Sequence, residues 1–204
     1  MGAMKESGLP AKLLYTLEKF MYERAEKIIV LLPYAKEYIV SRGISPEKVF
    51  WLPNGVNLDR FDHPSPLDPG SEVTKAFERY RDRFKVVYTG AHGPANGLEV
   101  MLKAASIVQD KGLGIHFFFI GDGPEKNNLI QKAGEMHLNN VSFLPPVSKD
   151  QVSSLLARAD MLVHTLKKMD VLRYGRSPNK MYDYLASAKP IVTSIEAKNN
   201  PVVE

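Results

Sequence analysis

Cysteine is absent from the chain, and its absence excludes two classes of site. Without cysteine among its 204 residues, the chain forms neither a disulfide nor a thiolate metal centre. Long apolar runs are missing too, since the longest strongly apolar run, residues 28–32, is far too short to cross a bilayer. No signal-peptide pattern begins the chain, and residues 1–4 are interpreted as an expression remnant. These absences fit a protein of a reducing compartment.

Signatures of several catalytic classes are also missing. The histidines show no metal-ligand spacing such as H-E-x-x-H, and His116, inside an apolar run, is predicted to pack in the core. The chain has no G-x-S-x-G nucleophile elbow, no G-x-x-x-x-G-K-[ST] phosphate loop and no Asp-x-Asp. No metal site is predicted, and a metal-dependent reaction is disfavoured.

The composition is that of an ordinary globular protein with a basic surface. Hydrophobic residues make up 44% and charged residues 25% of the chain, which excludes disorder, and the length suits one full domain and part of another. The formal charge is +4 and the pI is near 9.1. Because the Lys and Arg residues are scattered without interleaved aromatics, no nucleic-acid partner is predicted. A phosphorylated ligand or a membrane surface is favoured.

Strand-like and helix-like segments alternate along the chain, which is typical of a parallel βαβ fold. Residues 62–70 hold three prolines and are predicted to link two domains. A doubly wound, Rossmann-like α/β domain is expected from about residue 71, after a short helix over 71–83. Predicted strands cover residues 27–32, 48–52, 85–89, 115–120, 141–143, 161–163 and 190–193. Predicted helical stripes comprise Leu13, Leu17, Phe20 and Met21; Leu98, Met101, Leu102, Ala105 and Val108; and Val152, Leu155, Leu156 and Ala159, with a further helix from Pro33 to Gly43.

Two strand-to-helix junctions are rich in glycine. The segment from Gly90 to Gly97 follows a strand, and its glycines allow close approach of an anionic ligand to the backbone. A tight turn without a ligand explains this segment equally well. The segment from Gly121 to Pro124 also follows a strand, and Asp122 is expected to cap the next helix, a role that needs no ligand.

A third junction, residues 173–187, is the most informative. Ser177 is predicted to be the N-cap of a helix that starts at Pro178. Met181, Leu185 and Ala188 are then expected to face the core, and Asn179, Lys180 and Asp183 the ligand edge. With Arg173 and Arg176, Lys180 and the helix start form a plausible diphosphate cradle. The alternative is an ordinary surface helix with a Lys–Asp pair.

In this order, the junctions resemble glycosyltransferase family 4, whose members have the two-domain GT-B fold. The matching segments are 52–61, 88–99, 120–124, 143–145, 177–186 and 189–192. Residues 177–180, Ser-Pro-Asn-Lys, resemble the branch that contains N-acetyl-fucosamine transferases of bacterial surface-polysaccharide synthesis.

The resemblance implies a site for a nucleotide-sugar, preferably a UDP-sugar. It assigns the base to Phe143, Leu144 and Pro145, the ribose hydroxyls to Asp183, and the diphosphate to Gly90, His92, Gly93 and the helix start at Ser177 and Asn179, with Gly121, Asp122 and Gly123 beside them. The sequence departs from the family at Gly175, where an acid is usual, and at Ala91 and Asn96, where Arg and Lys are usual. Lys180 with Arg173 or Arg176 is therefore expected to neutralise the diphosphate.

The implied reaction is sugar transfer with retention of configuration and without a metal, to a glycan or polyprenyl-linked acceptor. By resemblance, residues 5–61 are the tail of an acceptor domain, 62–70 a linker and 71–204 an incomplete donor domain, so a fragment that binds donor without turnover is expected. A cytoplasmic location is implied, with possible contact to the inner face of the plasma membrane. A UDP-sugar 2-epimerase of the same fold and a non-catalytic nucleotide-sugar-binding module remain as alternatives.

Overall fold

The computed structural model describes residues 8–194, which divide into two compact units. Within these residues, the first unit comprises 8–54 and 170–177, and the second comprises 55–169 and 178–194. Residues 1–4, interpreted above as an expression remnant, lie outside the described range.

The first unit has a small core around a pair of parallel strands. Its elements are α1 (Leu9–Arg24), β1 (Ile28–Val30), α2 (Ala35–Ser41), η1 (Pro46–Lys48), β2 (Val49–Trp51) and η4 (Asp170–Tyr174). The strands β1 and β2 pair in parallel with Ile28 opposite Val49. The core of this unit is a cluster of buried apolar residues, Ile28, Val30, Ile39, Ile44 and Val49. Both strands were predicted and are confirmed, each shorter than expected.

The helices of the first unit differ in detail from the prediction. The helix expected to start at Pro33 begins at Ala35 and ends at Ser41, ahead of Gly43 with its φ of +89°. The stripe of α1 is exposed, from 51% at Leu17 to 70% at Leu13. Over residues 8–194, no helix has the length and apolar character needed to span a membrane.

The second unit is a five-stranded parallel sheet in the order β5-β4-β3-β6-β7, which confirms the predicted doubly wound fold. Its strands are β3 (Phe84–Thr89), β4 (Ile115–Ile120), β5 (Val141–Leu144), β6 (Met161–His164) and β7 (Ile191–Thr193). Its helices are α3 (Asp59–Asp62), α4 (Glu72–Arg79), η2 (Pro94–Asn96), α5 (Glu99–Asp110), α6 (Lys126–Glu135), η3 (Lys149–Gln151), α7 (Val152–Ala157) and α8 (Asn179–Ala186).

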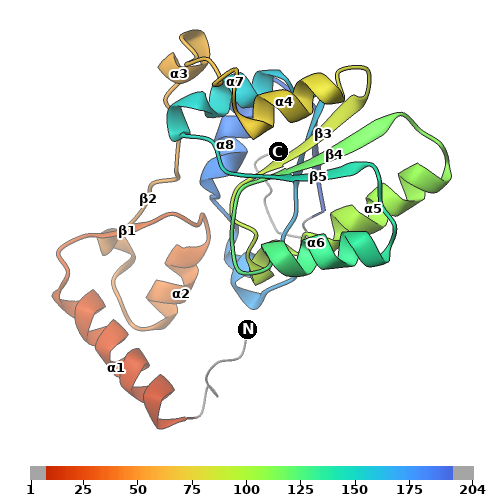
Figure 1. The fold of residues 1–204 in the computed structure, drawn as a ribbon. Coiled ribbons are helices and arrows are strands. Elements are labelled where there is room, and N and C mark those ends of the chain that lie inside the picture. Colours follow the sequence, from red (N-terminus) through yellow and green to blue (C-terminus); the bar gives the residue numbers. More distant parts are fainter. Residues whose placement is uncertain (1–7, 195–204) are drawn as a thin grey trace. The chain divides into compact units, whose positions relative to one another are not determined.

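Helices cover both faces of this sheet (Figure 1). Alternate strand residues point to opposite faces. Val87 and Phe118 pack in one core with residues of α4, α7 and α8. Val86 and Phe117 pack in a second core with residues of α5 and α6. His116 is 2% exposed, stacks on Tyr80 and bonds Ser142, so its predicted place in the core is confirmed.

Three local predictions are wrong at helix starts and faces. Asp122 does not cap α6, whose N-cap is Glu125, because the Asp122 carboxylate accepts the N–H of Gly123. Ser177 is not the N-cap of α8, because Pro178 occupies that position with an extended backbone. Leu185 is 43% exposed and does not face the core, where Tyr184 lies fully buried instead.

Candidate functional site

A cavity of about 430 Å³ opens at the carboxyl edge of the second unit's sheet. Thr89 and Ile120 are the last residues of β3 and β4, and both line it. The remaining lining residues are Gly90, Ala91, Gly121, Asp122, Pro146, Val147, Val152, Leu155, Lys180 and Asp183. Doubly wound sheets bind ligands at this edge, and the volume lies within the range of small-molecule sites.

The two glycine-rich junctions pack against each other backbone to backbone. The Gly90 N–H donates to the Ile120 carbonyl at 2.9 Å, and the His92 N–H to the Asp122 carbonyl at 2.7 Å. A Cβ on Gly121, whose φ is +146°, would overlap the Gly90 carbonyl, and a Cβ on Gly123 would lie 2.7 Å from the His92 carbonyl oxygen. Side chains at these positions would separate the loops, so the glycines shape this wall of the cavity.

Lys180 supplies the cation of the cavity. Its Nζ donates to the Tyr88 hydroxyl at 2.7 Å and lies 4.1 Å from the centre of the Tyr88 ring. A Cβ on Gly90 would lie 2.8 Å from this nitrogen, so glycine leaves room for the ammonium group beside the loop backbone. Burial lowers the pKa of Lys180 to about 8. At neutral pH the group is therefore mainly protonated and only partly hydrated, which favours binding of an anion.

The carboxylate of Asp183, one helical turn after Lys180, lines the same cavity. Burial raises its pKa, and the charges of Lys149 and Arg60 counteract part of this effect. Asp183 therefore provides a hydrogen-bond acceptor for hydroxyl groups of a ligand.

His92 belongs to the glycine loop, but it does not line the cavity. Its side chain is 0% exposed, among the rings of Tyr88, Phe119 and Phe143. Burial, with the nearby charge of Lys126, lowers the pKa of His92 to about 4, so the ring is neutral at pH 7. The backbone of His92 accepts the Glu125 N–H and ties the loop to the residues before α6.

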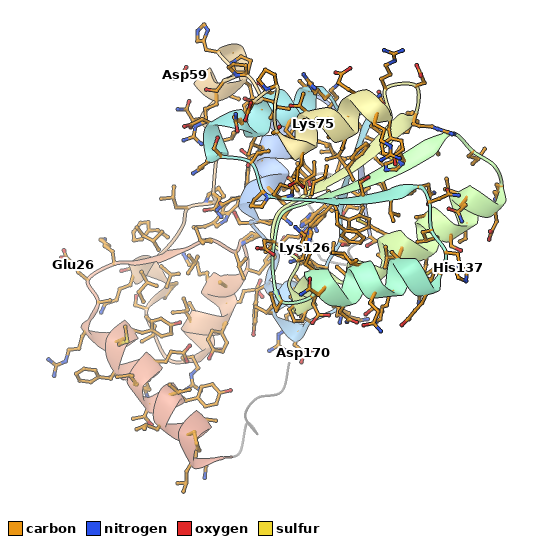
Figure 2. The ribbon with its side chains drawn as sticks, in the orientation of Figure 1. Glu26, Asp59, Lys75, Lys126, His137 and Asp170 are labelled. Atoms are coloured by element: carbon orange, nitrogen blue, oxygen red, sulfur yellow. The ribbon has the colours of Figure 1, made fainter. Side chains whose placement is uncertain are left out.

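The residues expected to hold the base are not lining residues of the cavity. Phe143 stacks on Phe119 at 4.8 Å, and the Leu144 carbonyl accepts the N–H of Gly121. Lys126, at the start of α6 in Figure 2, donates to the carbonyls of Gly121 and Leu144 and so joins the ends of β4 and β5. Pro145 is exposed, and the lining residues begin directly after it with Pro146 and Val147.

Arg173, Arg176 and Ser177 belong to the first unit. Arg173 is exposed, and its guanidinium lies 4.9 Å from the centre of the Tyr174 ring. Arg176 is 4% exposed, and none of its side-chain nitrogens meets a hydrogen-bond partner within the described residues. The Ser177 hydroxyl accepts the N–H of Asn54 at 2.9 Å.

Gly175 stands where the family it resembles usually has an acid, and the backbone there explains why this residue is glycine. Its φ is +86°, and a Cβ would lie 2.5 Å from the Pro33 side chain. An acidic side chain at this position would be strained and would collide with Pro33.

Two remaining candidates, Gly93 and Asn179, do not line the cavity, and some residues of the site were not predicted. Gly93 is the N-cap of η2, and Asn179, the first residue of α8, is exposed. Tyr88, whose hydroxyl accepts a hydrogen bond from Lys180, was not predicted as a site residue, although it is the last residue but one of β3, next to the glycine loop. Val152 and Leu155, the apolar lining residues of α7, look like core positions in the sequence, so their place in the cavity was not predicted.

Comparison with known proteins identifies similar chains. A family model described as "Glycosyl transferases group 1" matches residues 83–204. The "Putative colanic acid biosynthesis glycosyl transferase WcaI" of Escherichia coli is 24% identical over 192 residues, which cover 94% of this chain and 46% of the relative. The alpha-galactosylglucosyldiacylglycerol synthase of Streptococcus pneumoniae is 27% identical over 146 residues, which cover 70% of this chain and 38% of the relative. The chain thus spans less than half the length of these relatives.

Two solved structures show the same fold. Anabaena HepE, solved with UDP and glucose, aligns with a TM-score of 0.68 at 17% identity over 89% of this chain and 48% of that chain. WaaG, a glycosyltransferase involved in lipopolysaccharide biosynthesis, aligns with a TM-score of 0.66 at 18% identity over 92% of this chain and 50% of that chain. The five-stranded parallel sheet matches the C-terminal half of GT-B glycosyltransferases.

Proposed function

Since the chain belongs to the group 1 glycosyltransferases, we propose that its second unit binds the UDP-sugar donor of a retaining glycosyltransferase of bacterial polysaccharide or glycolipid synthesis. The observation that carries this proposal is the buried ammonium of Lys180 in the cavity at the strand ends. HepE was solved with UDP and glucose, which supports the choice of UDP.

The diphosphate is proposed to lie in the cavity beside the Lys180 ammonium and the loop at Gly90. The free N–H groups at the start of α8 add a positive partial charge there. No ion pair joins Lys180 to a carboxylate among residues 8–194, so its charge is available to a ligand anion. Arg173 and Arg176, which belong to the first unit, stay predictions from the sequence.

The nucleoside is proposed to lie toward Asp183 and the apolar part of the cavity. Asp183 accepts hydrogen bonds from the ribose hydroxyls in this arrangement. Pro146, Val147 and Leu155 line the cavity and offer apolar surface to a planar base. The backbone at the end of β5, at Phe143, Leu144 and Pro145, keeps the role in base recognition that the family resemblance implies.

The contribution of the chain to catalysis is proposed to be electrostatic. When the bond between the sugar and the diphosphate breaks, negative charge grows on the departing oxygen, and a fixed cation stabilises it. Lys180 supplies this cation from the protein, so the proposed reaction needs no metal. The alternative without catalysis is based on the missing acid at Gly175 and on the missing loop cations at Ala91 and Asn96. The backbone conformation accounts for the glycine at 175, and Lys180 is proposed to replace the loop cations.

The function of the whole protein is proposed from the family resemblance. Residues 5–61 are proposed to end an acceptor domain and residues 71–204 to form part of the donor domain, joined by 62–70. The acceptor is proposed to be a glycan or a polyprenyl-linked glycan at the cytoplasmic face of the plasma membrane. The Ser-Pro-Asn-Lys element at 177–180 supports a place near the N-acetyl-fucosamine transferases.

Calorimetric titration of the chain with UDP, GDP and ADP, without metal, tests the proposal. We expect UDP to bind and the other two nucleotides to bind weakly. The Lys180→Ala variant should lose about tenfold or more in UDP affinity, because a charge-assisted hydrogen bond to the diphosphate is lost.

Lys75→Ala is the matched control, since Lys75 is an exposed lysine of α4 in the same unit (Figure 2). It removes one positive charge and should leave UDP affinity unchanged. Equal UDP affinity in Lys180→Ala and the unaltered chain would remove Lys180 from the site. Absence of binding by all three nucleotides would contradict the donor-binding proposal.

A further inference from the structure

The hydroxyl of Tyr88 can act only as a hydrogen-bond acceptor toward Lys180. It donates its single proton to the Ala91 carbonyl at 2.8 Å. It must therefore accept the bond from the Lys180 ammonium at 2.7 Å, which has donors only. The Asn96 side chain donates to the same Ala91 carbonyl at 2.8 Å. These hydrogen bonds thus connect the glycine loop, at Ala91, to Lys180 of α8 through the Tyr88 hydroxyl.

A second tyrosine joins the same two elements through a hydroxyl that bonds Thr89 rather than the Lys180 ammonium. The Tyr184 hydroxyl of α8 accepts the Thr89 N–H, at the end of β3, at 2.9 Å. Tyr88 and Tyr184 are both 0% exposed. The two residues therefore make equivalent links between β3 and α8, but only the first includes the ammonium group.

The other titratable groups near Lys180 come from four segments. Asp122 lines the cavity after β4, and Asp183 lies on α8 itself. His92, in the glycine loop, is close enough for the charge of Lys180 to lower its pKa further. Tyr88, on β3, stays protonated because burial raises its pKa above its ordinary value. The hydrogen-bond acceptor of the ammonium is thus neutral, and neither Asp122 nor Asp183 forms an ion pair with it.

We propose that Tyr88 is a positioning residue, whose hydroxyl holds the Lys180 ammonium against the Gly90 backbone before a diphosphate binds. An ordered lysine loses less side-chain entropy when the ligand arrives, so this arrangement raises affinity for the nucleotide. The inference rests on the proposed function in one respect, namely that Lys180 binds the diphosphate.

The test compares Tyr88→Phe and Tyr184→Phe with the unaltered chain. The first readout is the pKa of Lys180 in the ligand-free protein, from an NMR titration of ¹³C-labelled lysines, with Lys180→Ala to assign the signal. The second is UDP affinity by calorimetry between about pH 7 and 9.5, a range that includes the Lys180 pKa of about 8. Thermal unfolding shows that each variant is folded.

Tyr88→Phe should lower the pKa of Lys180 below its value of about 8, because the charged form loses an acceptor. UDP affinity at neutral pH should fall about fivefold or more. Since binding needs the protonated lysine, affinity declines as pH rises through this pKa, and the decline should begin at lower pH in the variant. Tyr184→Phe should lower thermal stability and leave both readouts unchanged.

An unchanged Lys180 pKa and UDP affinity in Tyr88→Phe would overturn the proposal. Equal shifts in both variants would overturn it as well, because general loosening of α8 would then be the cause. Failure of the unaltered chain to bind UDP would contradict the proposed function, and the ligand-free pKa comparison would still decide whether Tyr88 positions Lys180.

Discussion

At the scale of single residues, the packing of two backbones against each other decides the shape of the site. Gly121 and Gly123 follow β4 with φ of +146° and +152°, and both face backbone atoms of the loop after β3. Backbone atoms cannot rotate away as a flexible side chain does. The requirement for glycine here is therefore both conformational and steric.

Gly121→Ala should destabilise the chain by about 2 kcal/mol or more, because its Cβ would overlap the Gly90 carbonyl in a strained backbone conformation. Gly134→Ala is the control, since Gly134 lies in α6 with no neighbour within 4 Å of a Cβ. It should stabilise the chain by about 0.5 kcal/mol through helix propensity. Urea unfolding measures both, and a Gly121→Ala variant as stable as the unaltered chain would contradict the loop packing.

At the scale of elements, helix starts follow from contacts as much as from residue type. Ser71 and Ser177 both precede a helix, and only Ser71 caps one, by accepting the Thr74 N–H at 3.1 Å. Ser177 instead accepts the N–H of Asn54, which is distant in sequence. The N-cap preference of serine is a local tendency, and a tertiary partner overrode it at α8.

Ser71→Ala should cost about 1 kcal/mol, because α4 loses its side-chain cap. Ser148→Ala is a matched control, because Ser148 precedes η3 with a similar extended backbone but makes no side-chain cap bond. Its effect should stay within about 0.5 kcal/mol. Chemical denaturation compares the two, and equal losses of stability would show that the Ser71 cap contributes nothing specific.

At the scale of the whole molecule, the two units have cores of different size. The first unit buries a small cluster around β1 and β2, whereas the second has a core on each face of its sheet. Hydrophobic stabilisation grows with the apolar area removed from water. The first unit should therefore unfold at a lower temperature than the second.

Trp51, the single tryptophan, lies in the first unit and reports its unfolding by fluorescence. UDP should leave this fluorescence transition in place and raise the later transition seen by circular dichroism. At about 100 times the dissociation constant, the expected stabilisation is about 2.7 kcal/mol. Lys180→Ala, with its affinity about tenfold weaker, should reduce this stabilisation to about 1.4 kcal/mol or less at the same UDP concentration. A UDP-dependent rise of the Trp51 transition would contradict a donor site formed by the second unit.

The sequence by itself determined the class of the fold and the region of the site. The alternation of apolar strands and helical stripes predicted every strand of the second unit's sheet, because burial of β-strands and amphipathic helices imposes periodicities that are visible locally. Lys180 and Asp183 were placed at the ligand edge from their spacing on one helix, and both line the cavity.

Only the tertiary structure decided which side chains share the cavity and which do not. The His92 side chain is buried and does not line the cavity, the Tyr88 hydroxyl bonds Lys180, and Pro146 lines the cavity directly after the residues expected there. These outcomes depend on contacts between segments far apart in the chain. Local sequence patterns carry no distance information across such separations, so only packing determines them.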